Sequence, residues 1–475
     1  MRHILGEGAF GCVIKPSLKC NDMPGIPYDH YISKLMKSNA AKQELSDFII
    51  ISQLDKKNKY HLGTPTICVP DVKEADVIQD IEKCKRFNGQ DVLLHPEDYR
   101  ILILKDGGYD LSIFCKLHLK QFVLGHNSSQ LFWLHIHHLF KGLVFFKNND
   151  IVHYDLKPQN IVFDPQTMKF QFIDFGLMNR TSTIIETSKK SENKHAVFHW
   201  SYPIDNGFLN HAYFNDYKKL SRDKKREFET KFIHEIFPDK SYNNAEIIKN
   251  PYSFHILFSY IYLKKDWTDD AKNDLQLFFS SFDDYTATHS YANSVEKTVN
   301  SLDIYGLGFS LKYVLNEFYK LNAISKPFYK KVDSLLKTMY SFDLELREDS
   351  PEKLLYRYEQ ILQEFGLLSF FNKKIDHHHI INESMDITHN SNNNNTSRLE
   401  QFAYEDAIQI QDDCSEKGKE FNPITKRCVK KCAVGKRKNS QFKCVSKKNK
   451  HKVKKYKNGR KSKKRLRKEE TISIL

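Results

Sequence analysis

The residues best placed to do chemistry lie in one polar loop between two apolar, β-prone pairs. The stretch 151–164 reads I-V-H-Y-D-L-K-P-Q-N-I-V-F-D and presents Asp155, Lys157 and Asn160. A second carboxylate, Asp174, follows in the sequence I-D-F-G. A polar loop held between buried segments is a usual place for catalytic groups on a rigid scaffold. Taken alone, the stretch also fits a polar turn between two strands.

A glycine-rich segment near the start of the chain fits phosphate binding. Residues 4–13 read I-L-G-E-G-A-F-G-C-V, with glycines at positions 6, 8 and 11. Glycine lets the backbone approach phosphate oxygens, so that exposed N–H groups cradle the anion. A tight hairpin can carry the same glycines. A dinucleotide-binding turn requires a helix directly after the glycines, and V-I-K-P at 13–16 does not begin one, so we expect a strand on each side.

The order of these features resembles the protein-kinase signature set, namely glycines, a lysine, an Asp…Asn pair and D-F-G. Residues 31–35 alternate like a strand and place Lys34 where kinases hold the α- and β-phosphates of ATP. Lys15, close to the glycines, and Lys37, at the end of the strand, are its rivals. Residues 39–54 predict an amphipathic helix that carries Glu44, either as the partner of Lys34 or as a solvated side chain.

The resemblance implies ATP and Mg²⁺ as cofactors and a role for each residue. Asp155 would accept or align the proton of a substrate hydroxyl, and Lys157 would neutralise the transferring phosphoryl group. Asn160 and Asp174 would hold Mg²⁺ ions. A lysine two residues after the aspartate is similar to the serine/threonine-specific pattern. The nucleotide would lie against Lys34, Glu44 and the residues Leu5, Gly6, Glu7, Gly8, Ala9, Phe10, Gly11, Cys12 and Val13.

One position departs from the family pattern. The H-R-D of kinases has Tyr154 in place of the arginine. That arginine grips a phosphate on the activation loop, and a neutral tyrosine cannot form a bidentate charged pair. We therefore expect activity without phosphorylation of the serines and threonines in 181–195.

Other stretches predict the elements that position these groups. Residues 99–111 predict a buried strand that ends in a hinge near 104–108, and residues 131–147 predict a central buried helix. Three histidines cluster on that helix, and the two at 137 and 138 fall on different faces, which indicates packing and solvent contact and not metal binding. The three are His135, His137 and His138.

Later residues resemble the remainder of a kinase domain. Asp205 stands for the glutamate of A-P-E, and Arg347 for the arginine that pairs with it. Asp303 would bind the backbone of the catalytic loop; an acid at a helix start also fits simple helix capping. Periodic apolar stretches in 206–299 predict additional helices.

Composition separates a folded body from a basic tail. The chain has 475 residues, a length sufficient for about two to three domains. Its hydrophobic content of 40% and aromatic content of 13% indicate that most of it folds. Residues 414–475 carry 24 Lys and Arg against 4 Asp and Glu; the whole chain carries +15, so residues 1–413 carry −5. No apolar run approaches the roughly 20 residues that cross a bilayer, and the early glycines leave no room for a secretory signal, so we expect no membrane partner.

The cysteines fall into two groups. Four cluster in the tail, and five lie in the first quarter of the chain without metal-ligand spacing. In a reducing compartment we expect these five to be free thiols. They are Cys12, Cys20, Cys68, Cys84 and Cys115.

Three tail segments are predicted. Residues 375–413 contain an asparagine run without apolar periodicity, typical of a linker. Residues 414–446 read in part N-P-I-T-K-R-C-V-K and resemble a small two-cysteine adaptor module of large cytoplasmic DNA viruses. For Cys414, Cys428, Cys432 and Cys444, disulfides, zinc and free thiols stay open. Residues 447–475 are polybasic, and the run 447–468 fits binding of nucleic acid or an acidic partner, a nuclear signal, or a solubilising tail.

The kinase resemblance, which covers about residues 1–368, implies an α+β protein with the two-lobed kinase fold. It would comprise an N-lobe at 1–106, a C-lobe at 107–368 with a large helical insertion at about 206–299, and a flexible basic tail. The chain resembles a serine/threonine protein kinase of an iridovirus-like virus, which implies protein substrates and a place in the host cytoplasm (virus factory) or the virion. The tail adds the nucleus, and the adaptor likeness implies a virion partner through 414–446. The rivals are a pseudokinase scaffold, a nucleic-acid-associated structural protein and a kinase of small molecules.

Overall fold

The computed structural model describes residues 2–7, 11–23, 25–73, 75–84, 87, 89–237 and 253–368, together with four short strands between 419 and 446. The chain divides into two compact units, Met1–Ser384 and Met385–Leu475. The first unit is a mixed α+β protein whose named strand pairs are antiparallel. In the described part of the chain, no helix has the length and apolar character needed to span a membrane.

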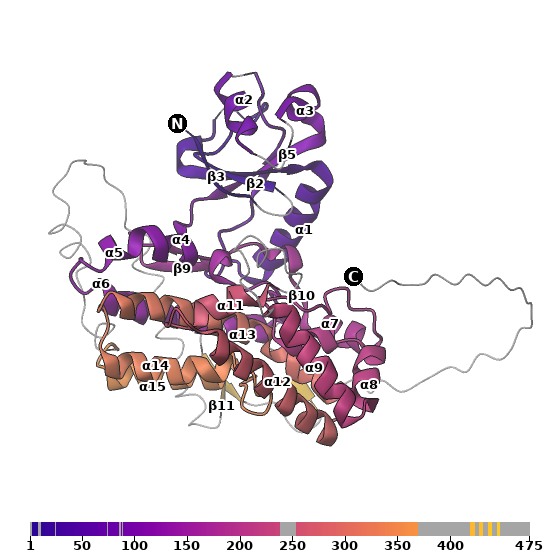
Figure 1. The fold of residues 1–475 in the computed structure, drawn as a ribbon. Coiled ribbons are helices and arrows are strands. Elements are labelled where there is room, and N and C mark those ends of the chain that lie inside the picture. Colours follow the sequence, from indigo (N-terminus) through magenta and orange to yellow (C-terminus); the bar gives the residue numbers. More distant parts are fainter. Residues whose placement is uncertain are drawn as a thin grey trace, which may run out of the picture. The chain divides into compact units, whose positions relative to one another are not determined.

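A five-stranded antiparallel sheet forms the N-terminal part of the first unit, in the order β1-β2-β3-β5-β4 (Figure 1). Its strands are β1 (His3–Glu7), β2 (Gly11–Lys15), β3 (Tyr31–Lys37), β4 (Thr66–Cys68) and β5 (Tyr99–Lys105). Helix α1 (Ser38–Leu54) follows β3 directly. The strands expected on both sides of the glycines, the strand at 31–35 and the helix at 39–54 are confirmed.

Both faces of this sheet are covered. Successive side chains of a strand point to opposite faces, so neighbouring residues of β5 belong to different core clusters. Leu102 and Leu104 of β5 join the main core, which includes residues of α1. Ile101 and Ile103 join a second cluster with residues of α2 (Ala75–Glu82) and α3 (Gly89–Leu94). We call α2 and α3 the outer cap; Figure 1 shows them on the side of the sheet away from the helical part.

Four of the cysteines expected to be free thiols form two disulfides in this part. Cys12 is bonded to Cys84 and Cys20 to Cys68, with Cα–Cα distances of 6.2 and 5.8 Å. The prediction is wrong for these four, because the partners are separated by 72 and 48 residues and only the packed sheet and cap bring them together. Cys115 is free and buried, as expected.

The remainder of the unit, up to residue 368, is mainly helical. The predicted strand at 99–111 ends earlier, at Lys105, and the short strand β6 (Tyr109–Asp110) follows the hinge. The predicted helix at 131–147 is confirmed as α6 (Ser128–Asn148). The other elements are α4 (Leu111–Ile113), a π-helix (Phe114–His118), α5 (Leu119–Phe122), β7 (Ile151–Val152), β8 (Ile161–Asp164), β9 (Lys169–Phe172), β10 (Asn179–Arg180), α7 (Thr181–Lys189), α13 (Tyr291–Lys320), α14 (Lys326–Met339) and α15 (Pro351–Glu364).

Additional helices occupy the predicted insertion at 206–299. They are α8 (His211–Lys219), α9 (Arg222–Ile236), α11 (Phe254–Ile261) and α12 (Thr268–Thr288). Their apolar faces join the main core through residues such as Phe214, Phe232 and Phe282. Helix α13 is buried on all sides over residues 301–315, as expected of a central helix.

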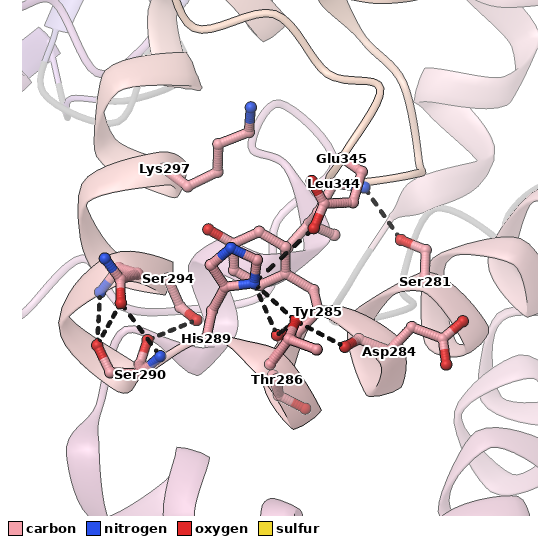
Figure 2. A network of polar contacts seen from close by, with 12 residues as sticks. Ser281, Asp284, Tyr285, Thr286, His289, Ser290, Ser294, Lys297, Leu344 and Glu345 are labelled. Atoms are coloured by element: carbon pink, nitrogen blue, oxygen red, sulfur yellow. Dashed lines mark hydrogen bonds and ion pairs between the residues drawn. The ribbon is translucent and has the colours of Figure 1, made fainter.

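Polar contacts hold the segment 343–349 against α12 and α13 (Figure 2). Ser281 Oγ accepts a hydrogen bond of 3.0 Å from the backbone N–H of Leu344. Lys297 Nζ donates to the carbonyl oxygen of Arg347 at 2.6 Å. Because its backbone is fixed in this way, Arg347 presents its guanidinium to Asp205, and the predicted ion pair forms with both side chains 1% exposed.

The second unit contains two antiparallel strand pairs among its described residues. Strand β11 (Lys419–Asn422) pairs with β12 (Arg427–Lys430), and β13 (Lys436–Lys438) with β14 (Cys444–Ser446). Cys428 lies on β12 and Cys444 on β14. Cys414, Cys432, the predicted linker at 375–413 and the basic run at 447–468 lie outside the described residues.

Candidate active site

The predicted catalytic loop runs between the short buried strands β7 and β8, as expected. Within it, Asp155 Oδ2 accepts hydrogen bonds from Lys157 Nζ at 2.7 Å and from Asn160 Nδ2 at 2.9 Å. Asn160 Nδ2 also donates to the carbonyl oxygen of Asp155 at 2.8 Å. Both side-chain bonds end on Oδ2, so among the described residues no donor occupies Oδ1. Oδ1 therefore keeps its acceptor capacity for a bound hydroxyl.

Asp303 anchors the start of this loop. Its carboxylate accepts the backbone N–H of His153 at 2.7 Å and that of Tyr154 at 3.0 Å. This confirms the predicted contact with the loop backbone. The helix-capping alternative is wrong, because Asp303 lies in the interior of α13, which begins at Tyr291. Burial raises the pKa of Asp303 to about 7, against the opposing effect of the two N–H donors.

His153 connects the loop to the segment that carries Asp174. Its Nδ1 accepts the backbone N–H of Asp155 at 3.4 Å, and its Nε2 donates to the carbonyl oxygen of Ile173 at 3.0 Å. The ring is therefore neutral, with its proton on Nε2. Burial lowers the pKa of His153, which favours the same neutral form. The loop and the I-D-F-G segment are thus held together by a completely buried side chain.

Lys34 joins the N-terminal part to this segment. Its Nζ lies 2.7 and 2.8 Å from the two carboxylate oxygens of Glu44 on α1, and 3.6 Å from Asp174 Oδ1. The expected Lys34–Glu44 pair is confirmed. The rival lysines are paired elsewhere: Lys15 with Asp106, and Lys37 with Asp91.

The charges of Lys34, Glu44 and Asp174 shift one another's pKa values. The protein atoms packed around Asp174 oppose its ionisation even though its side chain is 44% exposed, but the nearby Lys34 and Lys157 outweigh this effect and lower the pKa of that carboxyl. Burial likewise opposes the charge on Lys34, yet Asp174 and Glu44 raise its pKa above the usual value. The pKa of Glu44 is raised because burial exceeds the effect of Lys34. A lysine cation between two carboxyl groups is therefore the favoured state.

Asn160 and Asp174 offer oxygen ligands of the kind that Mg²⁺ prefers. Asp174 has a left-handed backbone conformation (φ 63°), and its side chain is 44% exposed, so the carboxylate is accessible to a cation from solvent. Because Asn160 directs Nδ2 at Asp155, its Oδ1 is the part of the amide left for a ligand. The donor set therefore fits the predicted ion.

A second group of potential ligands, Cys20, Asp22 and Cys68, has its atoms within 4.8 Å of one another. Its two sulfurs form a disulfide and are not thiolates. This group therefore differs in kind from the oxygen donors at Asn160 and Asp174.

Strand β2, which follows the glycine-rich turn, lies directly beside the strand that carries Lys34. Val13 on β2 is the direct partner of Lys34 on β3. A Cβ atom at Gly11 would lie 2.3 Å from the carbonyl oxygen of Leu35, so only glycine permits this approach of the two strands. Leu5, Gly6 and Glu7 lie on β1 and Cys12 on β2, whereas Gly8, Ala9 and Phe10 are outside the described residues.

Tyr154 occupies the position where the kinase pattern has arginine. Its backbone is left-handed (φ 70°) and its side chain is buried. The hydroxyl donates to Asn206 Oδ1 at 2.9 Å, and Asn206 Nδ2 donates to the carbonyl oxygens of His195 and Val197 at 2.7 and 3.0 Å. Burial raises the pKa of Tyr154 to about 12, so the phenol is neutral. All of these contacts are between neutral groups.

Three residues near the loop were not assigned a role from sequence. His199 lies close enough to Lys157 that burial and this charge lower its pKa to about 4. The Tyr202 ring is 5.2 Å from that of Tyr154. Tyr260 of α11 accepts a hydrogen bond of 2.9 Å from Gln159, so α11 contacts the predicted catalytic loop.

The sequence carries only a weak pattern that could have indicated these three residues. His199 and Tyr202 lie in the stretch 199–205, which reads H-W-S-Y-P-I-D, and only Asp205 in it resembles a residue of the A-P-E motif. Tyr260 is separated from Gln159 by 101 residues, a distance at which no local pattern operates. Neither models of known protein families nor curated protein sequences give a match to this chain, so the geometry of the site carries the functional argument.

Proposed function

We propose that the chain is an ATP-dependent serine/threonine protein kinase. The observation that carries this proposal is the position of Lys34, whose Nζ contacts Glu44 at 2.7 Å and Asp174 at 3.6 Å. In protein kinases the corresponding Lys–Glu pair and D-F-G aspartate must both be in place for phosphoryl transfer. A pseudokinase has no need to retain all of these groups together with Asp155, Lys157 and Asn160.

The residues would act mainly by positioning and by charge. Lys34 would bind the α- and β-phosphates of ATP, below the glycine-rich segment. Asp155 would align the substrate hydroxyl through Oδ1 and receive its proton, while Lys157 offsets negative charge on the transferring group. Mg²⁺, when bound, supplies charge neutralisation on the phosphates, and Asn160 and Asp174 would hold it.

The two-lobed kinase fold is part of the proposal. The five-stranded sheet with α1 corresponds to an N-lobe at 1–106, and the helical part to a C-lobe at 107–368. The contact of Asp303 with the loop backbone and the buried Asp205–Arg347 pair support this correspondence. The helices within 206–299 would be a family-specific insertion.

The setting of the enzyme is proposed from the sequence. The adaptor-like segment 414–446 favours an iridovirus-like virus, with action in the host cytoplasm or the virion on protein substrates. The polybasic run favours an additional nuclear or nucleic-acid role.

Transfer of radiolabelled phosphate from ATP to a basic protein substrate tests the proposal. Asp155→Ala and Asp174→Ala should each lower the rate by about 100- to 10,000-fold. Asp164→Asn, at the end of β8 and outside the site, is the matched control and should retain activity. Phosphoamino-acid analysis should identify phosphoserine or phosphothreonine. Absence of transfer by the wild-type chain would reject the enzyme, and transfer only to small molecules would reject the protein substrate.

A second candidate function rests on the basic run. Residues 447–468 contain 14 Lys and Arg and no acid. Binding by phosphate neutralisation should weaken steeply as salt rises. Deletion of residues 447–475 should therefore abolish retention of the chain on DNA at low salt; unchanged retention would exclude this role.

A further inference from the structure

Two disulfides connect the N-terminal sheet to its surroundings on the outer side. Cys12 directly follows Gly11 at the start of β2, and its partner Cys84 lies two residues after α2. Cys20 follows β2, and its partner Cys68 ends β4. The Cα–Cα distances of 6.2 and 5.8 Å are within the usual range for disulfides.

Cys12 lies between the outer cap and the candidate nucleotide site. In the sheet it is the partner of Glu7 on β1 and of Leu35 on β3. Side chains alternate along a strand, so Cys12 and Ile14 point to the outer-cap face while Val13 points to the face of Lys34. The strand that follows the glycine-rich turn is thus covalently attached to the cap on one face and contributes to the candidate site on the other.

The outer cap consists of two short helices. Helices α2 and α3 have 8 and 6 residues, too short to be stable as isolated helices. Val77, Ile81 and Val92 are their buried contacts in the second core cluster. Arg2 also pairs with Asp80 of α2, and Tyr99 donates to Asp91 of α3. Local opening of this small cap would give a reductant access to the buried Cys12–Cys84 bond.

We propose that Cys12–Cys84 is a redox modification site that controls nucleotide binding. The proposal rests on the proposed function only in taking ATP as the ligand. The reductant is a dithiol: one thiolate attacks a sulfur of the disulfide to give a mixed disulfide, and the second thiol of the reagent displaces the protein thiol. Two electrons pass to the protein, which gains two thiols, and the reagent becomes a cyclic disulfide. With the bond broken, β2 loses its covalent support and the nucleotide binds more weakly.

The test uses the full chain purified without reductant and divided into untreated and dithiothreitol-treated samples. Denaturation with N-ethylmaleimide, followed by peptide mapping, should find Cys12–Cys84 and Cys20–Cys68 linked in the untreated sample. Titration with a fluorescent ATP analogue and Mg²⁺ should give a Kd at least about fivefold higher after reduction, the lower end of usual coupling between sites.

Variants separate this bond from the other cysteines. Cys84→Ser leaves the strand sequence intact and should show the higher Kd without reductant and no further response to it. Cys115→Ser, which removes a free buried thiol of the helical part, is the matched control and should behave as wild type.

Three results would overturn the proposal: free thiols at Cys12 and Cys84 in the untreated chain, an equal Kd in the two samples, or a dithiothreitol response that persists in Cys84→Ser. If that variant does not fold, Cys68→Ser, which removes only the other disulfide, should keep the higher Kd after reduction, and loss of the response in that variant would also overturn the proposal. Redox-dependent nucleotide binding without phosphoryl transfer would reject the enzyme and leave the redox site standing.

Discussion

The hydroxyl of Tyr154 donates a 2.9 Å hydrogen bond to Asn206, and this neutral contact lies where the kinase pattern has an arginine. The segment that follows I-D-F-G is also held without modification. Ser182 N donates to Asp150 at 2.9 Å, and Tyr291 Oη donates to the carbonyl oxygen of Ser188 in α7 at 2.7 Å. An arginine–phosphate pair is not needed to order these residues.

We therefore predict that phosphatase treatment leaves phosphoryl transfer unchanged. Tyr154→Phe should instead lower stability by about 1–2 kcal/mol, because it leaves the buried Asn206 Oδ1 without its donor. Urea denaturation measures the free energy of unfolding, and Tyr356→Phe, at an exposed tyrosine, is the matched control. Loss of activity both after phosphatase and on mutation of a serine or threonine in 181–195 would contradict the prediction.

The Lys34–Glu44 pair should act as a unit. Lys34→Met and Glu44→Gln should each lower kcat/KM, on the order of 100-fold for the lysine, because a charged donor to the phosphates is lost or misplaced. The double variant should lose much less than the sum of the two effects on the free-energy scale. Lys37→Met, on the same strand but exposed, should retain activity. Strictly additive losses would show that Glu44 does not orient Lys34.

Asp303 should be required for the shape of the catalytic loop. Asp303→Asn replaces one acceptor oxygen by an NH₂ group, which leaves one of the two buried N–H groups of His153 and Tyr154 unpaired. The expected cost is about 1–3 kcal/mol of stability, together with a lower kcat. Thermal denaturation and steady-state kinetics check both, with Asp266→Asn, at an exposed aspartate, as the control. Wild-type values for both quantities would exclude the anchoring role.

His199 should contribute to acid sensitivity. Its pKa in the folded chain is about 4, lowered by burial and by Lys157, and that of an unfolded histidine is about 6.5. Above the unfolded value both states are neutral. Between about pH 6.5 and 4 only the unfolded chain binds the proton, so the free energy of unfolding falls as pH falls.

Denaturation at pH 7.5 and pH 5 measures this effect. His199→Gln should reduce the difference in stability between the two pH values, because it removes one proton-binding group of the unfolded chain. His126→Gln, at an exposed histidine, should leave the difference unchanged. An undiminished difference in His199→Gln would show that the ring is not held neutral in the folded chain.

Patterns local to the sequence identified most of the chemical groups. The spacing of glycines, Asp155, Lys157 and Asn160 was readable because a loop between short strands is specified by neighbouring residues. The helices at 39–54 and 131–147 were found from apolar periodicity, and their observed bounds, Ser38–Leu54 and Ser128–Asn148, differ by a few residues. The order of these elements along the chain was sufficient to predict an α+β fold.

The sequence by itself therefore determined which groups are present and which local elements carry them. The kinase resemblance also predicted the pairs Lys34–Glu44 and Asp205–Arg347. Only the tertiary structure decided three other contacts: Tyr154 with Asn206 across 52 residues, Asp303 within a helix and not at its start, and Cys12 with Cys84. Hydrophobic periodicity specifies which face of an element is buried but not which element covers it. Contacts between residues far apart in the chain arise only when those faces pack. The free-thiol prediction was drawn from an expected reducing compartment, and nothing local to the sequence showed which cysteines would meet.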